Sequence, residues 1–361
     1  MIPMADLRRI IEKHGPFASV CFDSSHDTED AARQLELRWS SIDAKLESSG
    51  ARPRIRRLLA QEIERHPPMQ GRCGRLLIAD ETEVLADERL PSPPDAETVR
   101  VSPLPYLLPL IEIESEQIPH VVAVVDRVGS ELYSLDEHGA EFGEALRGAD
   151  HPVHKVRRGG WSHRTIQQRV ENTTRRNIRE FAHEVDRLAD TVHADVIVLA
   201  GEVQARSELR AEIGAGGREV IEAESGTLAP NSDPKALDAE VREILRRVAT
   251  DRRRQVLDRF AAELGRPDGL AVNGLAGTSN ALRAANVERM LLHRGALGDR
   301  LVLAGTTPNP LIGPPTDTTA GEMRRADEAL PVAALATDAA ITVVDDATAL
   351  RDGVGALLRH R

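Results

Sequence analysis

Hydrophobic positions recur with two different periods along this chain, and each change of period separates a predicted strand from a predicted helix. In residues 1–118 short alternating stretches and longer helical stretches follow one another, and a proline-rich segment then interrupts regular structure. This is the pattern of a mixed α/β unit. Its predicted elements are a short helix that ends at Gly15, a strand at 18–23, a helix from 28 to about 48, and a hairpin of strands at 74–80 and 83–90.

The next stretch predicts one sheet and one long helix. Strands are expected at 120–126, 130–135 and 152–156, and a continuous apolar run at 195–200 has the character of a buried strand. Between them, residues 164–192 have helical period, and at about 100° per residue their apolar positions share one face. That face consists of Ile166, Val170, Ile178, Phe181, Val185, Leu188 and Val192.

The last third of the chain alternates helices and strands. A long helix is predicted at 236–264 and strands at 269–272, 287–292, 301–304 and 341–344, which together favour an α/β/α sandwich. Residues 306–315 predict an irregular surface excursion. We therefore expect an α/β protein with three domains. They are an N-terminal α/β domain (1–118), a central mixed-sheet domain with a long basic helix (119–229), and the C-terminal sandwich (230–361).

Composition narrows the functional classes. Only 2% of the 361 residues are aromatic, which argues against an aromatic-lined ligand pocket, and no cofactor is expected. Cys21 and Cys73 form no CxxC pair, and the histidines have no metal-ligand spacing, so we expect no disulfide framework and no metal site. The apolar runs are too short for a secretion signal or a bilayer span, which predicts a cytoplasmic protein without a membrane partner.

Positive charge is concentrated in one segment of an acidic chain. The formal net charge of the whole chain is −11, yet residues 154–179 hold eight basic side chains and a single acidic one, Glu171. Segregation of this kind is typical of a surface that binds nucleic-acid phosphates. The predicted RNA-binding face consists of Lys155, Arg157, Arg158, Arg164, Arg169, Arg175, Arg176 and Arg179.

A loop with two glycines lies inside this basic segment. Gly159 and Gly160 can adopt backbone conformations that other residues avoid, and they let a chain approach RNA closely. Trp161 and Ser162 follow at the predicted tip, where an indole can stack on a base. These four residues are the predicted ribosome- and tRNA-binding loop.

The combination resembles the central domain of the archaeo-eukaryotic class-one peptide-chain release factors. There too a strand like residues 121–126 (VVAVVD) precedes a Gly-Gly tip that is flanked by bases and followed by a basic helix. Residues 280–292 and 345–358 resemble parts of the α/β/α domain that these factors share with kink-turn-binding ribosomal proteins. The chain is most similar to the bacterial branch, which includes mycobacterial release-factor-like proteins and the Balon-type ribosome-hibernation factors. The resemblance therefore implies a release-factor-like central domain in a three-domain chain.

Two departures from the release factors shape the functional expectation. In those factors the tip is Gly-Gly-Gln, and the glutamine helps water attack the peptidyl-tRNA ester. Trp161 replaces it here and lacks the carboxamide, although its backbone N–H survives, so the chain is not expected to rely on a catalytic residue. The N-terminal unit also lacks the Asn-Ile-Lys-Ser and Tyr-x-Cys-x-x-x-Phe signatures of stop-codon readers.

A factor that keeps the shape but lacks both sets of side chains suits occupation of the vacant tRNA (A) site, which would silence or protect ribosomes in stress or dormancy. The expected partner is the ribosome, through rRNA and tRNA, and not DNA. The resemblance also implies contact between elongation factor Tu and the C-terminal domain.

Other interpretations stay open. The chain could be a codon-independent peptidyl-tRNA hydrolase for stalled ribosomes, or a protein-interaction module that never meets RNA. Gly159-Gly160-Trp161 could be an ordinary surface turn, and the arginine face a solvated one. Residues 23–27 favour a turn that caps a helix over a metal cluster, and residues 273–278 favour a capped strand-to-helix turn over a phosphate cradle.

Overall fold

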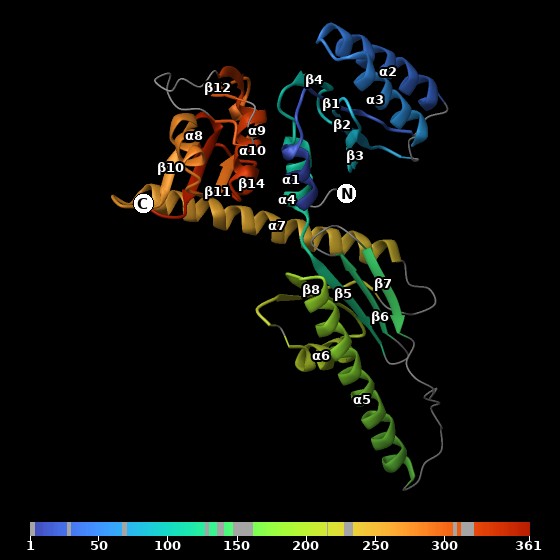
Figure 1. Ribbon diagram of the computed structural model, residues 1–361. Helices are drawn as coiled ribbons and strands as arrows, with labels where there is room; N and C mark the ends of the chain where they lie inside the picture. Colours follow the sequence, from blue (N-terminus) through green and yellow to red (C-terminus); the bar gives the residue numbers. More distant parts are fainter. Residues whose placement is uncertain are drawn as a thin grey trace. The chain divides into compact units, whose positions relative to one another are not determined.

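The structure is a computed structural model of the chain (Figure 1). It describes residues 4–26, 30–66, 71–126, 130–135, 141–146, 162–214, 216–226, 234–305, 309–311 and 321–361. These residues form two compact units, one from Met1–Ser115 with Arg252–Arg361 and one from Glu116–Asp251. Both units combine helices with sheets, so the predicted α/β class is confirmed.

The N-terminal part of the first unit is built on an antiparallel sheet with strand order β3-β2-β1-β4. Alternate residues of β1 point to opposite faces, so Ala18 and Val20 pack against α2 and α3, whereas Phe17 and Cys21 face α1 and α4. The first helix, the 18–23 strand, the second helix and the hairpin were predicted; α3, β4 and α4 were missed. The elements are α1 (Met4–Glu12), β1 (Phe17–Asp23), α2 (Ala31–Ser48), α3 (Pro53–Arg65), β2 (Gly74–Ala79), β3 (Val84–Leu90), β4 (Thr98–Ser102) and α4 (Leu108–Glu116).

The C-terminal part of this unit is the predicted α/β/α sandwich. Its sheet has the order β10-β15-β11-β14, with β11 and β14 parallel and the other pairs antiparallel. Met290 and Leu292 of β11 face α8 and α10, while Leu291 between them packs with Phe260 of α7 on the opposite face. The elements are β10 (Ala271–Asn273), α8 (Leu275–Arg283), β11 (Val287–Leu292), α9 (Arg294–Leu297), β12 (Leu301–Ala304), β13 (Glu322–Arg325), α10 (Ala326–Ala336), β14 (Ala340–Val343) and β15 (Val354–Leu358).

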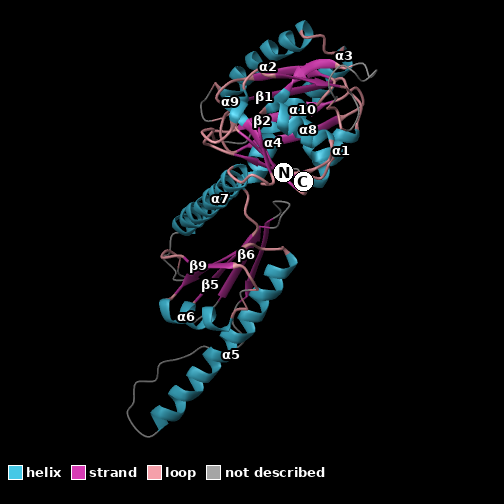
Figure 2. Cartoon of the chain, turned by 90° about the vertical axis from the view of Figure 1, so that its left-hand side faces the viewer, coloured by secondary structure: helices cyan, strands magenta, loops and turns pink. Residues whose placement is uncertain are grey.

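The second unit is a mixed sheet with helices on both faces. Its strand order is β7-β6-β5-β8-β9. Strands β5, β8 and β9 run parallel, whereas β6 pairs antiparallel with both β5 and β7. Helices α5 and α6 lie on one face (Figure 2), and the first half of α7 packs on the other. The elements are β5 (His120–Val125), β6 (Ser130–Leu135), β7 (Glu141–Leu146), α5 (Ser162–Thr191), β8 (Val196–Gly201), α6 (Val203–Glu212), β9 (Glu219–Glu222) and α7 (Pro234–Leu264).

One glycine fixes the connection between β8 and α6. Gly201 has φ of 113°, and a Cβ there would lie 1.9 Å from the carbonyl oxygen of Val125. Only glycine tolerates both the backbone conformation and the close approach of β5. This contact ends the parallel β5–β8 pair.

Several expectations for this region have different outcomes. The strands at 120–126, 130–135 and 195–200 and the helix at 164–192 are confirmed, and β9 and α6 were missed. The strand predicted at 152–156 lies outside the described residues. In the described part, the strand that follows β6 along the chain and pairs with it is β7, which was not predicted. Most of the 306–315 excursion is also outside them.

The long helix α7 contributes to both units. Val241, Ile244 and Val248 pack on the central sheet, whereas Phe260 packs with β11 and β15 in the first unit. The boundary between the two units along the chain therefore lies inside α7, between Asp251 and Arg252. The three domains with boundaries near 118 and 229 stay a prediction.

Candidate nucleic-acid interface

The predicted interface is centred on the start of α5. Ser162 is the first residue of that helix. The rest of the predicted loop, Gly159, Gly160 and Trp161, lies outside the described residues, and so do three of the predicted bases, Lys155, Arg157 and Arg158. The other predicted bases, Arg164, Arg169, Arg175, Arg176 and Arg179, all belong to α5.

Helix α5 extends well beyond the sheet that it packs on. Figures 1 and 2 both show its N-terminal half projecting past the ends of the strands, while the C-terminal half lies along the sheet. The structure thus brings the start of the helix, where four of the eight predicted bases lie, away from the core of its own unit.

The C-terminal half of α5 is anchored by apolar side chains. Phe181 is 5% exposed, Val185 is fully buried, and both pack in the cluster that includes Val121 of β5 and Leu199 of β8. Ile178 and Val192 are buried in the same cluster, and Leu188 packs against it. Five of the seven positions predicted for the apolar face are therefore confirmed, and the side chains of the other two, Ile166 and Val170, lie outside the described part.

The two halves of α5 differ in charge as well as in packing. Residues 162–176 carry four arginines and one acid, whereas residues 177–191 carry two arginines and four acids. The acids of the second half bind within the unit. Asp186 accepts the Gly214 N–H at 3.1 Å, and Asp190 pairs with Arg218. The unbalanced positive charge of the helix is therefore confined to its first half.

Arg179 stands at the boundary between these halves, and it already has an acidic partner. Its Nε lies 3.1 Å from Oε2 of Glu212, the last residue of α6. Hydrogen bonding and the carboxylate charge raise the pKa of Arg179, and the same contacts lower the pKa of Glu212. Both side chains are exposed, so the pair is weak and a phosphate can compete for the guanidinium.

Glu212 is a residue that the sequence did not single out. It lies 33 positions after Arg179, and only the packing of α6 against α5 brings the two together. Nearby bases are also neutralised, because Arg206 and Arg210 of α6 both pair with Glu222 of β9. The α6 side of this face is thus electrically balanced, unlike the start of α5.

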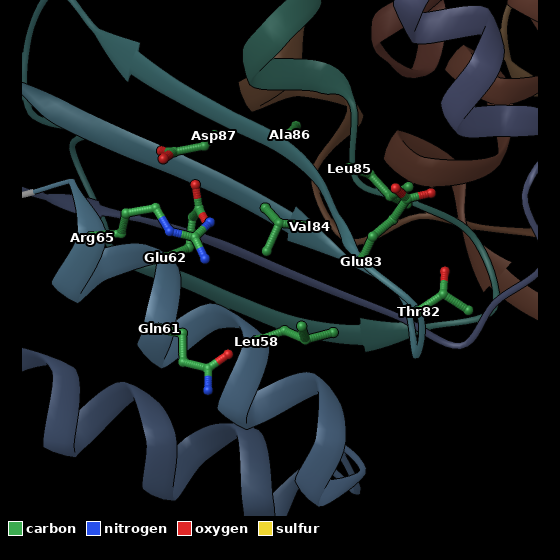
Figure 3. Close-up of a pocket in the computed structure, with 10 residues that line it drawn as sticks. All are labelled: Leu58, Gln61, Glu62, Arg65, Thr82, Glu83, Val84, Leu85, Ala86 and Asp87. Atoms are coloured by element: carbon green, nitrogen blue, oxygen red, sulfur yellow. The ribbon is translucent and has the colours of Figure 1, made fainter.

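A pocket of about 450 Å³ lies between α3 and the edge strand β3 in the N-terminal part (Figure 3). Two of its lining residues, Glu62 and Asp87, form with His66 a group whose ligand atoms are close enough for a metal ion. However, Arg75 donates to both oxygens of Asp87 at 2.7 Å and also to the carbonyl oxygens of Glu62 and His66. Because this nearly buried guanidinium already supplies a cation, the cluster is better explained as an ion-pair network that closes the end of α3.

Two short polar segments have structural roles. Within 23–26, Asp23 accepts the Ser25 N–H as in a turn, but α2 begins after Asp30, which makes no side-chain cap, so the predicted capping role is wrong. At 273–278, the carboxylate of Asp352 accepts the Leu275 N–H at the start of α8. The predicted strand-to-helix turn is confirmed, although its N-cap residue, Gly274, makes no side-chain cap, and the Asp352 carboxylate occupies the place where a phosphate would bind.

Sequence comparison identifies relatives of the whole chain and of its middle. A sequence model described as Bacterial archaeo-eukaryotic release factor family 2 matches residues 119–266. The uncharacterized protein Rv2629 of Mycobacterium tuberculosis (strain H37Rv) is 35% identical over 98% of this chain and 96% of its own length. None of the helices in the described residues is both long and apolar enough to cross a membrane.

Comparison with solved structures finds chains of low sequence identity. An archaeal translation termination factor, aRF1, is 16% identical, with coverage of 99% of this chain and 98% of that chain and a TM-score of 0.26. The archaeal Pelota chain in a model of ribosome-bound Pelota and ABCE1 is 12% identical, with coverage of 99% and 93% and a TM-score of 0.43.

Proposed function

Because the chain belongs to the bacterial branch of the archaeo-eukaryotic release factor superfamily, we propose that it is a ribosome-associated translation factor that occupies the vacant A site. There it silences or protects ribosomes in stress or dormancy and does not read stop codons. The observation that carries this proposal is the first half of α5, where four arginines and one acid extend past the sheet directly after the Gly159-Gly160-Trp161 loop.

The charge distribution supports RNA as the partner. Each phosphate that a base neutralises releases condensed counterions, so a cluster of arginines gives strong, salt-sensitive binding. The second half of α5 and the α6 side are balanced by acids, which favours one docking orientation over indiscriminate adhesion. In this orientation the basic start of α5 lies along rRNA and the glycine loop points toward the peptidyl-transferase centre.

Trp161 supports occupation over peptide release. An indole donates one hydrogen bond and accepts none, so it cannot position water as a carboxamide does. It can stack on an rRNA base or on the tRNA end, and such stacking contributes about 1–3 kcal/mol in single-stranded complexes. Trp161→Ala should weaken ribosome binding accordingly, and an unchanged affinity would remove the stacking role.

The first test is binding of the full chain to empty 70S ribosomes, measured by sedimentation across a salt series. The test variant is Arg175→Glu/Arg176→Glu on α5. The matched control is Arg246→Glu/Arg247→Glu, which reverses the charge of two adjacent arginines on α7, a helix in which basic and acidic residues are interleaved. We expect the wild-type protein and the control to bind in a salt-sensitive manner. The test variant should lose at least roughly tenfold in affinity, with a salt slope smaller by about 1.4–1.8.

The possible results of this sedimentation experiment distinguish the proposed face from a general charge effect and from a lack of ribosome association. Equal losses in both double variants would indicate a general charge effect and contradict the proposed face. Absence of wild-type binding at low salt would contradict ribosome association itself. If binding is retained, suppression of translation in a purified system distinguishes a factor that silences ribosomes from one that only adheres to them.

A second candidate, peptidyl-tRNA hydrolysis on stalled ribosomes, is favoured by one observation, the retention of Gly159-Gly160 before a backbone N–H. That N–H could stabilise an oxyanion without a catalytic side chain. Release of labelled peptide by the purified chain, lost in Gly160→Ala, would establish this function. Contact with elongation factor Tu belongs to the leading proposal, and co-sedimentation of the two purified proteins with ribosomes tests it.

A further inference from the structure

The first unit contains a buried network of charges between the N-terminal sheet and the C-terminal sandwich. Asp327 and Glu328, in the first turn of α10, are each 4% exposed. Arg100 of β4 lies between them, with Nη1 and Nη2 at 3.0 and 2.9 Å from the Asp327 oxygens and Nη1 at 3.0 Å from Glu328. One arginine from residues 98–102 thus satisfies two carboxylates more than two hundred positions later in the chain.

Further contacts complete the network from both sides. The Ser102 hydroxyl donates to Glu328 at 2.8 Å, and Arg325 donates to both oxygens of Asp327 at 3.0 and 2.9 Å. The guanidinium of Arg100 also lies 3.7 Å from the centre of the Tyr106 ring, which is 1% exposed. A charge that is removed from water is stabilised only when its hydrogen bonds are replaced, and these contacts replace them.

The burial of α10 shows that other elements pack on every side of this helix. Every residue from 326 to 335 is buried, although a helix that lies on the outside of a sandwich normally has one polar, exposed face. Its own sheet covers one side. Helix α1 packs on α10, and one continuous apolar cluster joins Ile10 of α1 and Ile111 of α4 to Leu330 of α10.

We propose that Arg100 is a latch that holds the N-terminal sheet and the C-terminal sandwich together as one rigid body. A partner that binds either part then moves both. Opening the latch would separate Asp327 and Glu328 from the Arg100 guanidinium and would expose the apolar side of α10, so the closed state is strongly preferred. This inference does not depend on the proposed ribosomal function.

Distance measurement between two spin labels tests the latch in the full chain. Exposed residues Glu64 on α3 and Arg283 on α8 are changed to cysteine, while Cys21 and Cys73 are buried and should not react. The test variant is Arg100→Met, which keeps a long side chain over Tyr106. The matched control is Arg56→Met, because Arg56 binds both oxygens of Asp43 with similar exposure but joins only α2 to α3.

We expect a single narrow distance distribution in the wild-type protein and in Arg56→Met. Arg100→Met should add a second, broader component, with at least a roughly tenfold rise in the separated population. Circular dichroism verifies folding. If Arg100→Met does not fold, Arg100→Lys replaces it, because a single ammonium cannot maintain the paired contacts with Asp327, and the same broadening is expected. A narrow distribution in the Arg100 variant, or a broad one already in the wild-type protein, would overturn the latch.

Discussion

The two long helices of this chain have nearly the same length and similar numbers of arginines, yet only one predicts a nucleic-acid interface. Helix α5 has 30 residues and α7 has 31. In α7, arginines and acids are interleaved along both halves, and Arg246, Arg253 and Arg259 pair with Glu243, Asp345 and Glu288. In α5 the arginines gather in the half that projects past the sheet.

This comparison shows that the arginine content of a helix is a poor guide to its partner. What differs is where the compensating acids lie and what covers the helix. Helix α7 packs by its apolar positions in both halves, first on the central sheet and then on the C-terminal sheet. The described side chains of α5 pack in its second half, where four of the five acids of the helix lie. The contrast predicts that stability and RNA binding depend on different halves of α5, whereas charge changes on α7 leave RNA binding unchanged.

The largest expected effect tests this separation through Phe181. Truncation of a buried phenylalanine costs about 3–5 kcal/mol, so Phe181→Ala should destabilise the central unit by that amount. Hydrogen exchange of the β8 amides should accelerate by at least roughly a hundredfold, since each 1.4 kcal/mol corresponds to a factor of ten. Amides of β11, in the other unit, should not change.

Phe260→Ala on α7 provides the matched control for Phe181. It should accelerate exchange in β11 and β15 instead, because Phe260 packs there and is fully buried. If Phe181→Ala leaves the β8 amides as protected as before, the second half of α5 is not the anchor of its unit. Arg175→Glu/Arg176→Glu should change neither set of amides.

A smaller effect is expected at an acid of α7 that binds within its own unit. The Glu240 carboxylate accepts the backbone N–H groups of Glu224 and Ser225, each at 2.7 Å. Burial raises the pKa of Glu240, but these hydrogen bonds outweigh it and hold the pKa below its ordinary value. Glu240→Gln should therefore lower the free energy of unfolding of the central unit by about 1 kcal/mol at pH 7.

The same hydrogen bonds give that difference a pH dependence. A carboxyl group whose pKa is lower in the folded state contributes stability above its ordinary value of about 4.3, and the contribution is lost as the pH falls through the folded value. Urea unfolding followed at pH 7 and below about pH 4 should show the gap between the wild-type protein and Glu240→Gln closing in acid. A gap that widens in acid would contradict the assigned role.

Periodic, locally determined features could be predicted from the sequence. The apolar stripe of α5 was visible because its members all lie on one face of a single helix, and β5 and β8 were each visible as a short, continuous apolar run. Helix α3 was missed although its signals were present, namely Pro53 at the first turn and the buried series Ile55, Leu59 and Ile63. Helix α10 confirms the helix expected between the strands at 301–304 and 341–344, but its bounds were not predicted because Pro331 interrupts an otherwise apolar stretch.

Contacts between distant elements carried no local signal. Asp327 and Glu328 look like ordinary acids in a first helical turn, and nothing beside them in the sequence points to Arg100. The same holds for Glu212, whose pairing with Arg179 depends on how α6 packs. The packing of the folded chain determines which of the predicted basic side chains pair with acids. A candidate site derived from composition alone therefore includes basic side chains, such as Arg179, that already have an acidic partner.

The smallest expected effect follows from that pairing. Glu212→Gln removes the carboxylate that neutralises Arg179 and should raise ribosome affinity about two- to fivefold, with a salt slope larger by up to about 0.9. The matched control is Glu243→Gln on α7, which changes the net charge equally and releases Arg246 from an exposed pair of similar length. Because α7 lies outside the proposed face, the control should leave affinity and slope unchanged in the same sedimentation series. Equal gains in both variants would mean that overall charge, and not the position of Arg179 at the end of the basic half of α5, determines binding.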